Sequence, residues 1–447
     1  MHMSKNNYSS IALLYAQHCI EKMSRFQAIM EAIDCDEIVI GSGQSKMQFQ
    51  DDMAYPFKAN PYFKEWIPLA KRADCYLHIR RNIDKPRLYL LTVEDIWHTP
   101  PESLPQGFEN SLEVIQYSSI EGLKKQLTAI DKGLLLINET NELGVPADHW
   151  NPQSLLNQID FQRRSKTAYE QACVRQANQL AVPAHRAAQQ AFLAGASELE
   201  IASAYTAACH CSENDMPYAI IAGVNQHAAV LHHHNLDNQR VAPHSFLIDA
   251  GMQFNGYAAD ITRTYAYDSG SEFAAMIGRM DTIQQQLVAA GAIGKSPMEL
   301  HVLSQHKIAQ ILIEFNLLKH SADQAVEQGI ISTFYPHGLG HHLGCNVHDK
   351  GSRLASPQGD LVPASEKYPK LRAGAPMVAN QIYTVEPGLY FIPALLDKLR
   401  AGEKADAVNW KEIDKWIIYG GIRIEDNIIL HQDGRLENVT RDAFSSI

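Results

Sequence analysis

The segment SFLIDAGMQFNGYAADITRTY, residues 245–265, decides the fold of the C-terminal half of the chain. Two alternating runs flank a turn that contains Asn255-Gly256, and this pattern predicts a β-hairpin. Asp249 and Asp260 are equidistant from a centre between residues 254 and 255. In a regular hairpin centred there, the two aspartates face each other with their Cβ atoms roughly 5 Å apart.

Two facing carboxylates repel each other, so a buried pair requires either a proton or a cation between them. Hydrolases with two metal ions hold the ions about 3.5–4 Å apart, a spacing that facing carboxylates can bridge. The simpler interpretation is a pair of solvated aspartates on an exposed hairpin face, because most aspartates are exposed. For an isolated pair, this simpler interpretation is favoured.

The segment PHGLGHHLGCNVHD, residues 336–349, gathers four histidines: His337, His341, His342 and His348. Its first two histidines have the spacing of a helical HExxH zinc site, but the intervening glycines break a helix and no glutamate follows. The segment is better explained as a loop that lies close to a metal ion, because glycine lets the backbone come near the ion. One imidazole can be a ligand while the others orient substrate or ligands. A structural role is the alternative for any single histidine.

Two glutamates follow further along the chain. Glu386 ends the predicted strand of IYTVEPGLY, where Pro387 and Gly388 stop strand pairing and expose the carboxylate. In GGIRIEDNIIL, the alternation places Arg423 and Glu425 on the face opposite the isoleucines. A salt-bridged surface strand would explain either segment alone. Together, four carboxylates and one imidazole suit Mn²⁺ or Co²⁺ better than a thiolate type of zinc site.

The remainder of the chain predicts two domains, at residues 1–157 and 158–447. The first reads as α/β, with a helix at 9–33 and strands at 37–40, 75–79, 88–92 and 133–137. Polar residues and a proline at 148–157 suggest a linker. The second reads as α+β, with a helix at 165–193 that Pro183 should kink or end, and with helices and mainly antiparallel strands beyond it.

Composition limits the classes of partner. A formal net charge of -11 argues against nucleic acid or an anionic membrane as the main partner. The 7 cysteines are scattered and form no CxxC pair, which is typical of reduced thiols. We find no signal peptide and no apolar run of about 18 residues. We therefore expect a cytoplasmic protein.

These segments, in this order, resemble the prolidases, Xaa-Pro dipeptidases of the pita-bread metallopeptidase superfamily, and most of all the bacterial group that includes the organophosphorus acid anhydrolases. The likeness runs nearly end to end and includes SENDMPY, FLIDAG, GYAADITRTY, PHGLGHH, TVEPGLYFI and GGIRIEDN. It implies a pita-bread catalytic domain. It also implies these metal ligands: Asp249, Asp260, His337, Glu386 and Glu425.

The resemblance further implies catalytic roles for Glu386, His232, His348 and Arg423, with Arg423 binding the substrate carboxylate or holding Glu425. Tyr218, Leu231 and Val347 would shape the pocket. Asp52 and Trp97 match positions with which a second subunit closes the site, so a homodimer is implied.

The expected activity is hydrolysis of Xaa-Pro dipeptides with two divalent ions. Mn²⁺ is the expected ion, with Co²⁺ and Zn²⁺ as alternatives. Hydrolysis of organophosphate triesters or fluorides is a secondary possibility, and a non-catalytic peptide-binding protein on the same fold is the alternative. A methionine aminopeptidase shares the C-terminal fold, but the long N-terminal domain and TVEPGLYFI argue against it. Three departures concern the pocket: Pro297 replaces an expected tyrosine, His233 changes LHY to LHH, and Cys345 lies in GCNVHD.

Overall fold

The computed structural model describes residues 5–92, 96, 97, 99–127 and 133–446, and the chain forms two compact units. Unit 1 comprises Met1–Cys173, Phe254–Tyr257 and Leu354–Asp360. Unit 2 comprises Val174–Gln253, Ala258–Arg353 and Leu361–Ile447. Unit 1 thus continues past the domain boundary predicted between residues 157 and 158.

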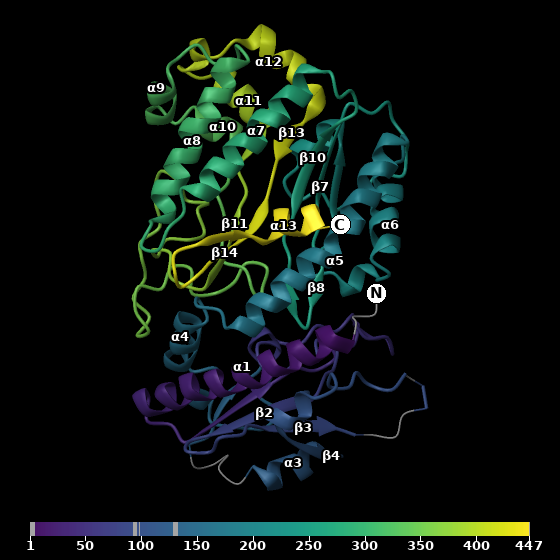
Figure 1. Cartoon of the computed structure of the whole chain (residues 1–447), viewed down its shortest axis with the longest axis vertical. Helices are drawn as coiled ribbons and strands as arrows, with labels where there is room; N and C mark the ends of the chain where they lie inside the picture. The colour runs from purple at the N-terminus through teal and green to yellow at the C-terminus, as the bar shows by residue number, and fades with distance from the viewer. Residues whose placement is uncertain (1–4, 93–95, 98, 128–132, 447) are drawn as a thin grey trace. The chain divides into compact units, whose positions relative to one another are not determined.

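Unit 1 is built on a five-stranded mixed sheet with the order β4-β3-β2-β1-β5 (Figure 1). The strands are β1 (Glu37–Gly41), β2 (Cys75–Arg80), β3 (Arg87–Leu91), β4 (Glu113–Tyr117) and β5 (Leu135–Ile137). The pairs β1–β2 and β2–β3 are antiparallel, whereas β3–β4 and β1–β5 are parallel. Four of these strands were predicted, and β4 was not.

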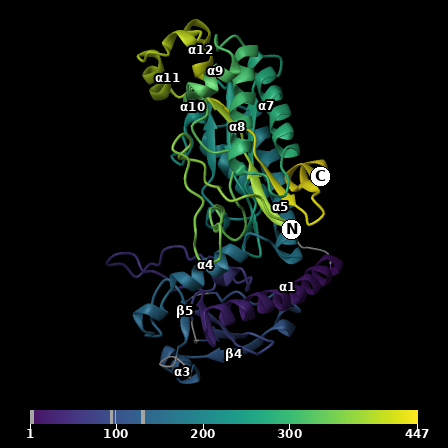
Figure 2. The ribbon, with the colours of Figure 1, turned by 90° about the vertical axis from the view of Figure 1, so that its left-hand side faces the viewer.

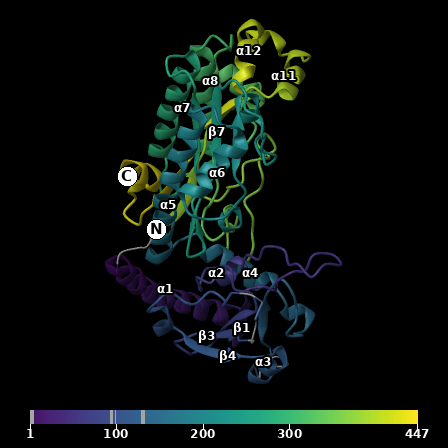
Figure 3. The same ribbon diagram turned by 90° about the vertical axis from the view of Figure 1, so that its right-hand side faces the viewer.

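Helices cover both faces of this sheet, because successive strand residues point to opposite sides. Ile38 and Ile40 of β1 pack in one core with Phe26 of α1 (Lys5–Ala32), a core to which α4 (Gln153–Gln162) also contributes. Val39 packs in the other core with Leu123 of α3 (Ile120–Gln126). Figures 1 and 3 show α1 and α3 on opposite sides of the sheet. The short α2 (Pro61–Lys64) follows β1.

Unit 2 contains antiparallel sheets that meet near the predicted ligands. The first has the order β10-β7-β6 and the second the order β11-β14-β15. Their strands are β6 (Ile221–Val224), β7 (Ser245–Asp249), β10 (Thr262–Ala266), β11 (Gln381–Val385), β14 (Asp426–Leu430) and β15 (Leu436–Asn438). Two further pairs are β8 (Gln253–Phe254) with β9 (Tyr257–Ala258), and β12 (Gly388–Tyr390) with β13 (Gly421–Arg423). A bridge between Thr262 and Glu425 joins the first sheet to the start of β14.

Helices pack on the sheets of unit 2, which gives the predicted α+β class. Figure 2 shows α7 (Glu272–Ala289) and α8 (Pro297–Glu314) side by side. Their apolar side chains share one core with Tyr383 and Val385 of β11. On the other sheet, Phe192 of α5 (Ala168–Leu193) stacks on Phe246 of β7, with ring centroids 5.2 Å apart. The α6 helix (Glu198–Ala208) contacts β6.

The remaining helices are short, and α5 departs from its prediction. They are α9 (Ala322–Glu327), α10 (Ile331–Phe334), α11 (Pro393–Arg400), α12 (Trp410–Trp416) and α13 (Val439–Ser446). The α5 helix continues through Pro183 rather than ending there. Proline removes one helical hydrogen bond, but buried neighbours on both sides of Pro183 hold the helix against the core.

Candidate metal centre

The hairpin places Asp249 and Asp260 on one face, but not directly opposite each other. Asp249 pairs with Thr262, and the same register continues to the turn. Asn255 and Gly256 have φ values of 50° and 86°, as a two-residue type I′ turn requires, so the turn centre lies between them. The predicted facing register is therefore wrong. Asp260 is the diagonal neighbour of Asp249, and both side chains still point to the same side of the sheet.

Arg423 holds one oxygen of Asp249. Its Nη2 donates to Asp249 Oδ2 at 2.6 Å, and its other donors reach Tyr390 Oη at 2.9 Å and Thr262 Oγ1 at 3.1 Å. Burial raises the pKa of Asp249 to about 6 despite the attraction of Arg423, and the charge of Asp260 adds to this rise. Asp249 Oδ1 is buried and accepts no hydrogen bond from the described residues. A buried anionic oxygen of this kind suits a cation.

Asp260 is fixed at its backbone and at both carboxylate oxygens. The Asn427 side chain accepts from the Asp260 N–H at 3.0 Å and donates to its carbonyl at 2.6 Å. Tyr218 Oη donates to Asp260 Oδ1 at 2.6 Å, and His341 Nε2 lies 3.4 Å from Oδ2. Burial opposes ionisation of Asp260, but the neighbouring imidazole and hydroxyl outweigh burial and lower the pKa. Asp260 is thus held ionised.

The two glutamates enter the same cluster from strand ends. Glu386 directly follows β11, and Glu425 lies between β13 and β14, where its Oε2 accepts from Thr262 Oγ1 at 2.7 Å. Burial first, and then the neighbouring carboxylates, raise the pKa of Glu386 to about 7 and that of Glu425 well above its usual range. Four carboxylates therefore share a site that cannot keep all of them ionised without positive charge.

The segment that carries the four histidines, residues 336–349, here called the histidine loop, is attached to β11 by backbone pairing. Three backbone hydrogen bonds of 2.8–3.1 Å join residues 339–343 to residues 382–386. Gly340 permits this approach, because a Cβ at that position would lie 1.8 Å from the Thr384 carbonyl oxygen. The pairing brings His341 Nε2 to 3.6 Å from Glu386 Oε1, beside its contact with Asp260. His341 Nδ1 donates to the His342 carbonyl at 2.9 Å, so Nε2 is the nitrogen that faces the carboxylates. Burial opposes protonation of this ring, but the hydrogen bond to Asp260 and the charge of Glu386 outweigh burial and raise the pKa of His341.

His337 occupies a different position. Its Nδ1 donates to the Gly338 carbonyl at 2.9 Å, and its Nε2 accepts from Tyr390 Oη at 2.8 Å. Burial lowers the pKa of His337 to about 3. Both ring nitrogens are therefore engaged, and its nearest carboxylate contact is 3.8 Å from Glu386 Oε2. In the described part of the chain, the group that brings three ligand atoms together here is Asp260, His341 and Glu425. The geometry favours His341 over the predicted His337.

The predicted substrate residues of unit 2 lie around this cluster to different degrees. Tyr218 and Arg423 contact the aspartates directly. His348 packs its ring edge-on against His341, with centroids 4.4 Å apart, and this partial burial of the ring lowers its pKa to about 4, although the residue as a whole stays accessible to solvent. His232 is exposed, and Leu231 and Val347 are half-buried.

Sequence reasoning missed Arg372. This arginine is exposed, and its charge contributes to the lowered pKa of both His232 and His348, after burial. The only signal in the sequence was a basic residue in LRAGAP, without a pattern around it. Asp52 and Trp97 belong to unit 1, where both are exposed.

Two family models and many relatives match the chain. The model of metallopeptidase family M24 matches residues 172–432, and that of the Xaa-Pro dipeptidase N-terminal domain matches residues 13–161. The Xaa-Pro dipeptidase of Colwellia psychrerythraea is 42% identical over 440 residues, which cover 97% of this chain and 98% of that protein. The Xaa-Pro dipeptidase of Pseudoalteromonas translucida is 40% identical over 435 residues, with coverage of 97% and 98%.

The chain belongs to metallopeptidase family M24.

Solved structures of lower identity support the fold of this M24 metallopeptidase. Aminopeptidase P of Escherichia coli superposes with a TM-score of 0.69 at 20% identity, covering 99% of this chain and 96% of that one. Proline aminopeptidase P II of Yersinia pestis gives a TM-score of 0.67 at 20% identity, with coverage of 99% and 97%. The predicted pita-bread fold is confirmed.

The residues of the cluster fit the divalent ions that the M24 family implies. A buried oxygen of Asp249 without a hydrogen bond, and the raised pKa values of Asp249, Glu386 and Glu425, indicate a site that favours positive charge. His341 Nε2 lies beside two of these carboxylates, 3.4 Å from Asp260 and 3.6 Å from Glu386. Mostly oxygen donors with a single imidazole are the set that manganese-like ions prefer. None of the helices formed by the described residues is long and apolar enough to cross a membrane.

Proposed function

We propose that this M24 metallopeptidase hydrolyses Xaa-Pro dipeptides with two divalent ions held by Asp249, Asp260, His341, Glu386 and Glu425. The observation that carries the proposal is the buried cluster of four carboxylates, two of which lie beside His341 Nε2. Relatives named Xaa-Pro dipeptidases, 40% and 42% identical along nearly the whole chain, support the substrate class. Mn²⁺ is the proposed ion, because oxygen donors predominate.

Metal ions bound here would polarise the scissile carbonyl and lower the pKa of an attacking water. Glu386 is the proposed general base, as the resemblance implies: it would accept a proton from that water and return it to the departing proline nitrogen. His232 and His348 have lowered pKa values and are neutral at pH 7. Their remaining N–H groups would donate to the oxyanion of the tetrahedral intermediate.

Arg423 is proposed to position a ligand rather than bind substrate. Arg423 is buried and donates to Asp249. The resemblance had implied Glu425 as the carboxylate that this arginine holds. The exposed Arg372, close enough to His232 and His348 to lower their pKa values, is the better candidate for the carboxylate of the dipeptide. Tyr218, Leu231 and Val347 would complete the pocket, as the resemblance implies.

The amino end of the dipeptide is proposed to meet a second subunit. In a homodimer, the partner copy would supply the positions of Asp52 and Trp97, with the Asp52 carboxylate pairing with the free amino group. The exposure of both side chains is compatible with such a role. Sedimentation of the wild-type enzyme and of the D52A variant tests the homodimer, and both proteins should be dimeric. Kinetic assays with an Xaa-Pro dipeptide test the role of Asp52, and D52A should show a raised KM.

The decisive experiment measures metal content and dipeptide hydrolysis in the same samples. Ala-Pro and Leu-Pro should be cleaved with Mn²⁺, and cleavage should disappear on chelation and in D249N. H341A should lose more than about 10-fold in metal affinity, the scale seen even for outer partners of ligands. H337A is the matched control and should retain its metal. Cleavage that survives complete metal removal, or full metal binding by H341A, would overturn the proposal.

A paraoxon assay on the same samples tests the organophosphate side activity. The non-catalytic alternative predicts a purified protein that binds Xaa-Pro peptides without cleaving them and holds no metal.

A further inference from the structure

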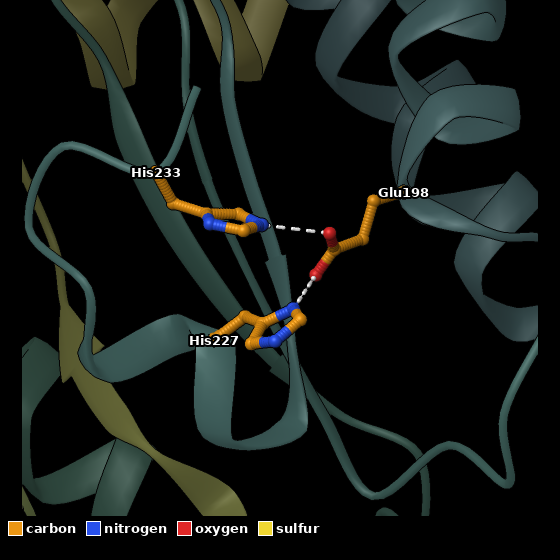
Figure 4. A group of neighbouring side chains, drawn as sticks. All are labelled: Glu198, His227 and His233. Carbon is orange, nitrogen blue, oxygen red and sulfur yellow. Dashed lines mark hydrogen bonds and ion pairs between the residues drawn. The ribbon is translucent and has the colours of Figure 1, made fainter. Parts of the chain in front are cut away.

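A second cluster of ligand-type side chains lies at the start of α6, apart from the five proposed ligands. Glu198 is buried, and its carboxylate accepts four hydrogen bonds. Two come from the backbone N–H groups of Val224 and Asp237, at 2.8 and 2.9 Å. The other two come from His227 Nδ1 at 2.8 Å and His233 Nε2 at 2.7 Å (Figure 4).

The arrangement has the dimensions of a metal site. One ligand atom from each of Glu198, His227 and His233 lies within 4.8 Å of the other two. Zinc sites with bonds of about 2.0–2.2 Å have ligand atoms about 3.3 Å apart. His227 Nδ1 lies 2.8 Å from one oxygen of Glu198 and His233 Nε2 lies 2.7 Å from the other, so the side chains would move apart to admit an ion. Figure 4 shows both rings directed at the two oxygens of one carboxylate.

A cation can take the place of the two N–H protons that lie between the imidazoles and Glu198, and both protons stay on the protein. Each imidazole now donates its N–H to Glu198, because a carboxylate only accepts. When a neutral imidazole becomes a ligand, that proton moves to its other ring nitrogen and the freed lone pair binds the ion. The two backbone donors keep the carboxylate oriented throughout, as outer hydrogen bonds do for metal ligands.

The site is open on one side. A cavity of about 330 Å³ is lined by Glu198 and His227, and also by Asp237 and His244. The His227 side chain is 46% exposed, whereas those of Glu198 and His233 are 3% and 10% exposed. The cavity therefore provides an entry path and room for water as a fourth ligand.

We propose that Glu198, His227 and His233 bind one Zn²⁺ ion with an open fourth position. Two imidazoles with one carboxylate select zinc over manganese, whereas the oxygen-rich catalytic cluster has the opposite preference. His233 directly follows the substrate-side His232 in the chain. A bound ion would therefore fix the loop that carries His232 without contacting the substrate.

The test uses the manganese-loaded enzyme equilibrated with Zn²⁺. H227N and H233Q place an amide donor where the imidazole nitrogen stood, so they keep the hydrogen bond to Glu198 and lose the ligand. H234A, at an exposed neighbour, is the matched control. Equilibrium dialysis should find one more Zn²⁺ per chain in the wild type and H234A than in H227N and H233Q, with at least tenfold weaker binding in those two variants. Exchange into the catalytic centre is common to all four proteins and cancels.

Anomalous diffraction at the zinc edge locates the ion in the wild type, independently of any variant. A peak between the three side chains supports the proposal. Its absence at saturating Zn²⁺, or equal zinc content in all four proteins, overturns it and leaves Glu198 as a hydrogen-bonding centre for the loop.

Discussion

Asn427 offers a direct test of how the fold positions Asp260. It lies on β14 with its side chain fully buried, and its amide pairs with both backbone groups of Asp260, as a neighbouring strand would. Its Oδ1 also accepts from Asn178 Nδ2 at 3.1 Å. N427D keeps the size and the acceptor but loses the donor to the Asp260 carbonyl, and it adds a buried negative charge beside the carboxylate cluster.

Two costs add in this variant. A buried carbonyl left without a donor costs about 1–3 kcal/mol, and a buried carboxylate without a cationic partner costs several kcal/mol more unless it takes up a proton. We therefore expect N427D to lose about 3–5 kcal/mol of unfolding free energy. Because Asn427 orients a proposed ligand, we also expect Mn²⁺ affinity to fall about 10–100-fold.

Urea unfolding of the metal-free enzyme and Mn²⁺ titration of the folded enzyme measure the two effects separately. N238A, at an exposed asparagine, should stay within about 0.5 kcal/mol of the wild type. If N427D unfolds at the wild-type urea concentration, the hydrogen-bonding argument is wrong. If it is destabilised but binds Mn²⁺ normally, Asn427 supports the sheet without positioning Asp260.

Three further perturbations have defined outcomes. G340A should lose about 3 kcal/mol or more, because its Cβ would overlap the Thr384 carbonyl, while G278A, with open space in α7, should gain up to about 1 kcal/mol in the same thermal unfolding assay. Burial lowers the pKa of His18 from 6.5 to about 4. Protonation of His18 therefore favours the unfolded chain, and about 3 kcal/mol of stability that is present above pH 6.5 is lost as the pH falls towards 4. H18Q should flatten that slope, and an unchanged pH profile would contradict it. Chelating divalent ions should lower the free energy of unfolding by about 2.7 kcal/mol when the metal is present at 100 times its Kd, and the unfolding midpoint should fall accordingly. An unchanged midpoint would show that the carboxylate cluster binds no ion.

The predictable part of the fold depended on local patterns. The Asn-Gly turn, the apolar strands β1 and β2 and the amphipathic helices were recognised because each carries its signal within a few residues. The β4 strand was missed because EVIQY is largely exposed at the edge of the sheet, where it shows no alternation of buried and exposed residues. Pro183 was expected to kink or end α5, and the helix continues because tertiary packing outweighs the lost hydrogen bond.

The hairpin pattern singled out Asp249 and Asp260 as candidate ligands, and the family resemblance added Glu386 and Glu425, but the mutual geometry of the two aspartates was predicted wrongly. The turn centre was placed one residue too early, which shifts the pairing by two positions and turns a facing pair into a diagonal one. The error left both aspartates on one face, because a shift of two preserves the alternation of a strand. An error of one position would have separated them.

The proposed histidine ligand shows where sequence spacing stops being informative. PHGLGHH has no regular structure of its own that would orient one ring over another, since Gly338 and Gly340 interrupt it. Orientation comes from pairing with β11, which turns His341 Nε2 to the carboxylates, and from Tyr390, which engages the free nitrogen of His337. Because Tyr390 also accepts from Arg423, the same hydroxyl links the arginine that holds Asp249 to His337. In Y390F, His337 Nε2 should therefore regain a free lone pair. A metal titration that reveals additional weak binding in Y390F, absent in Y390F/H337A, would demonstrate that Tyr390 keeps this nitrogen from binding metal, and identical titrations would contradict it.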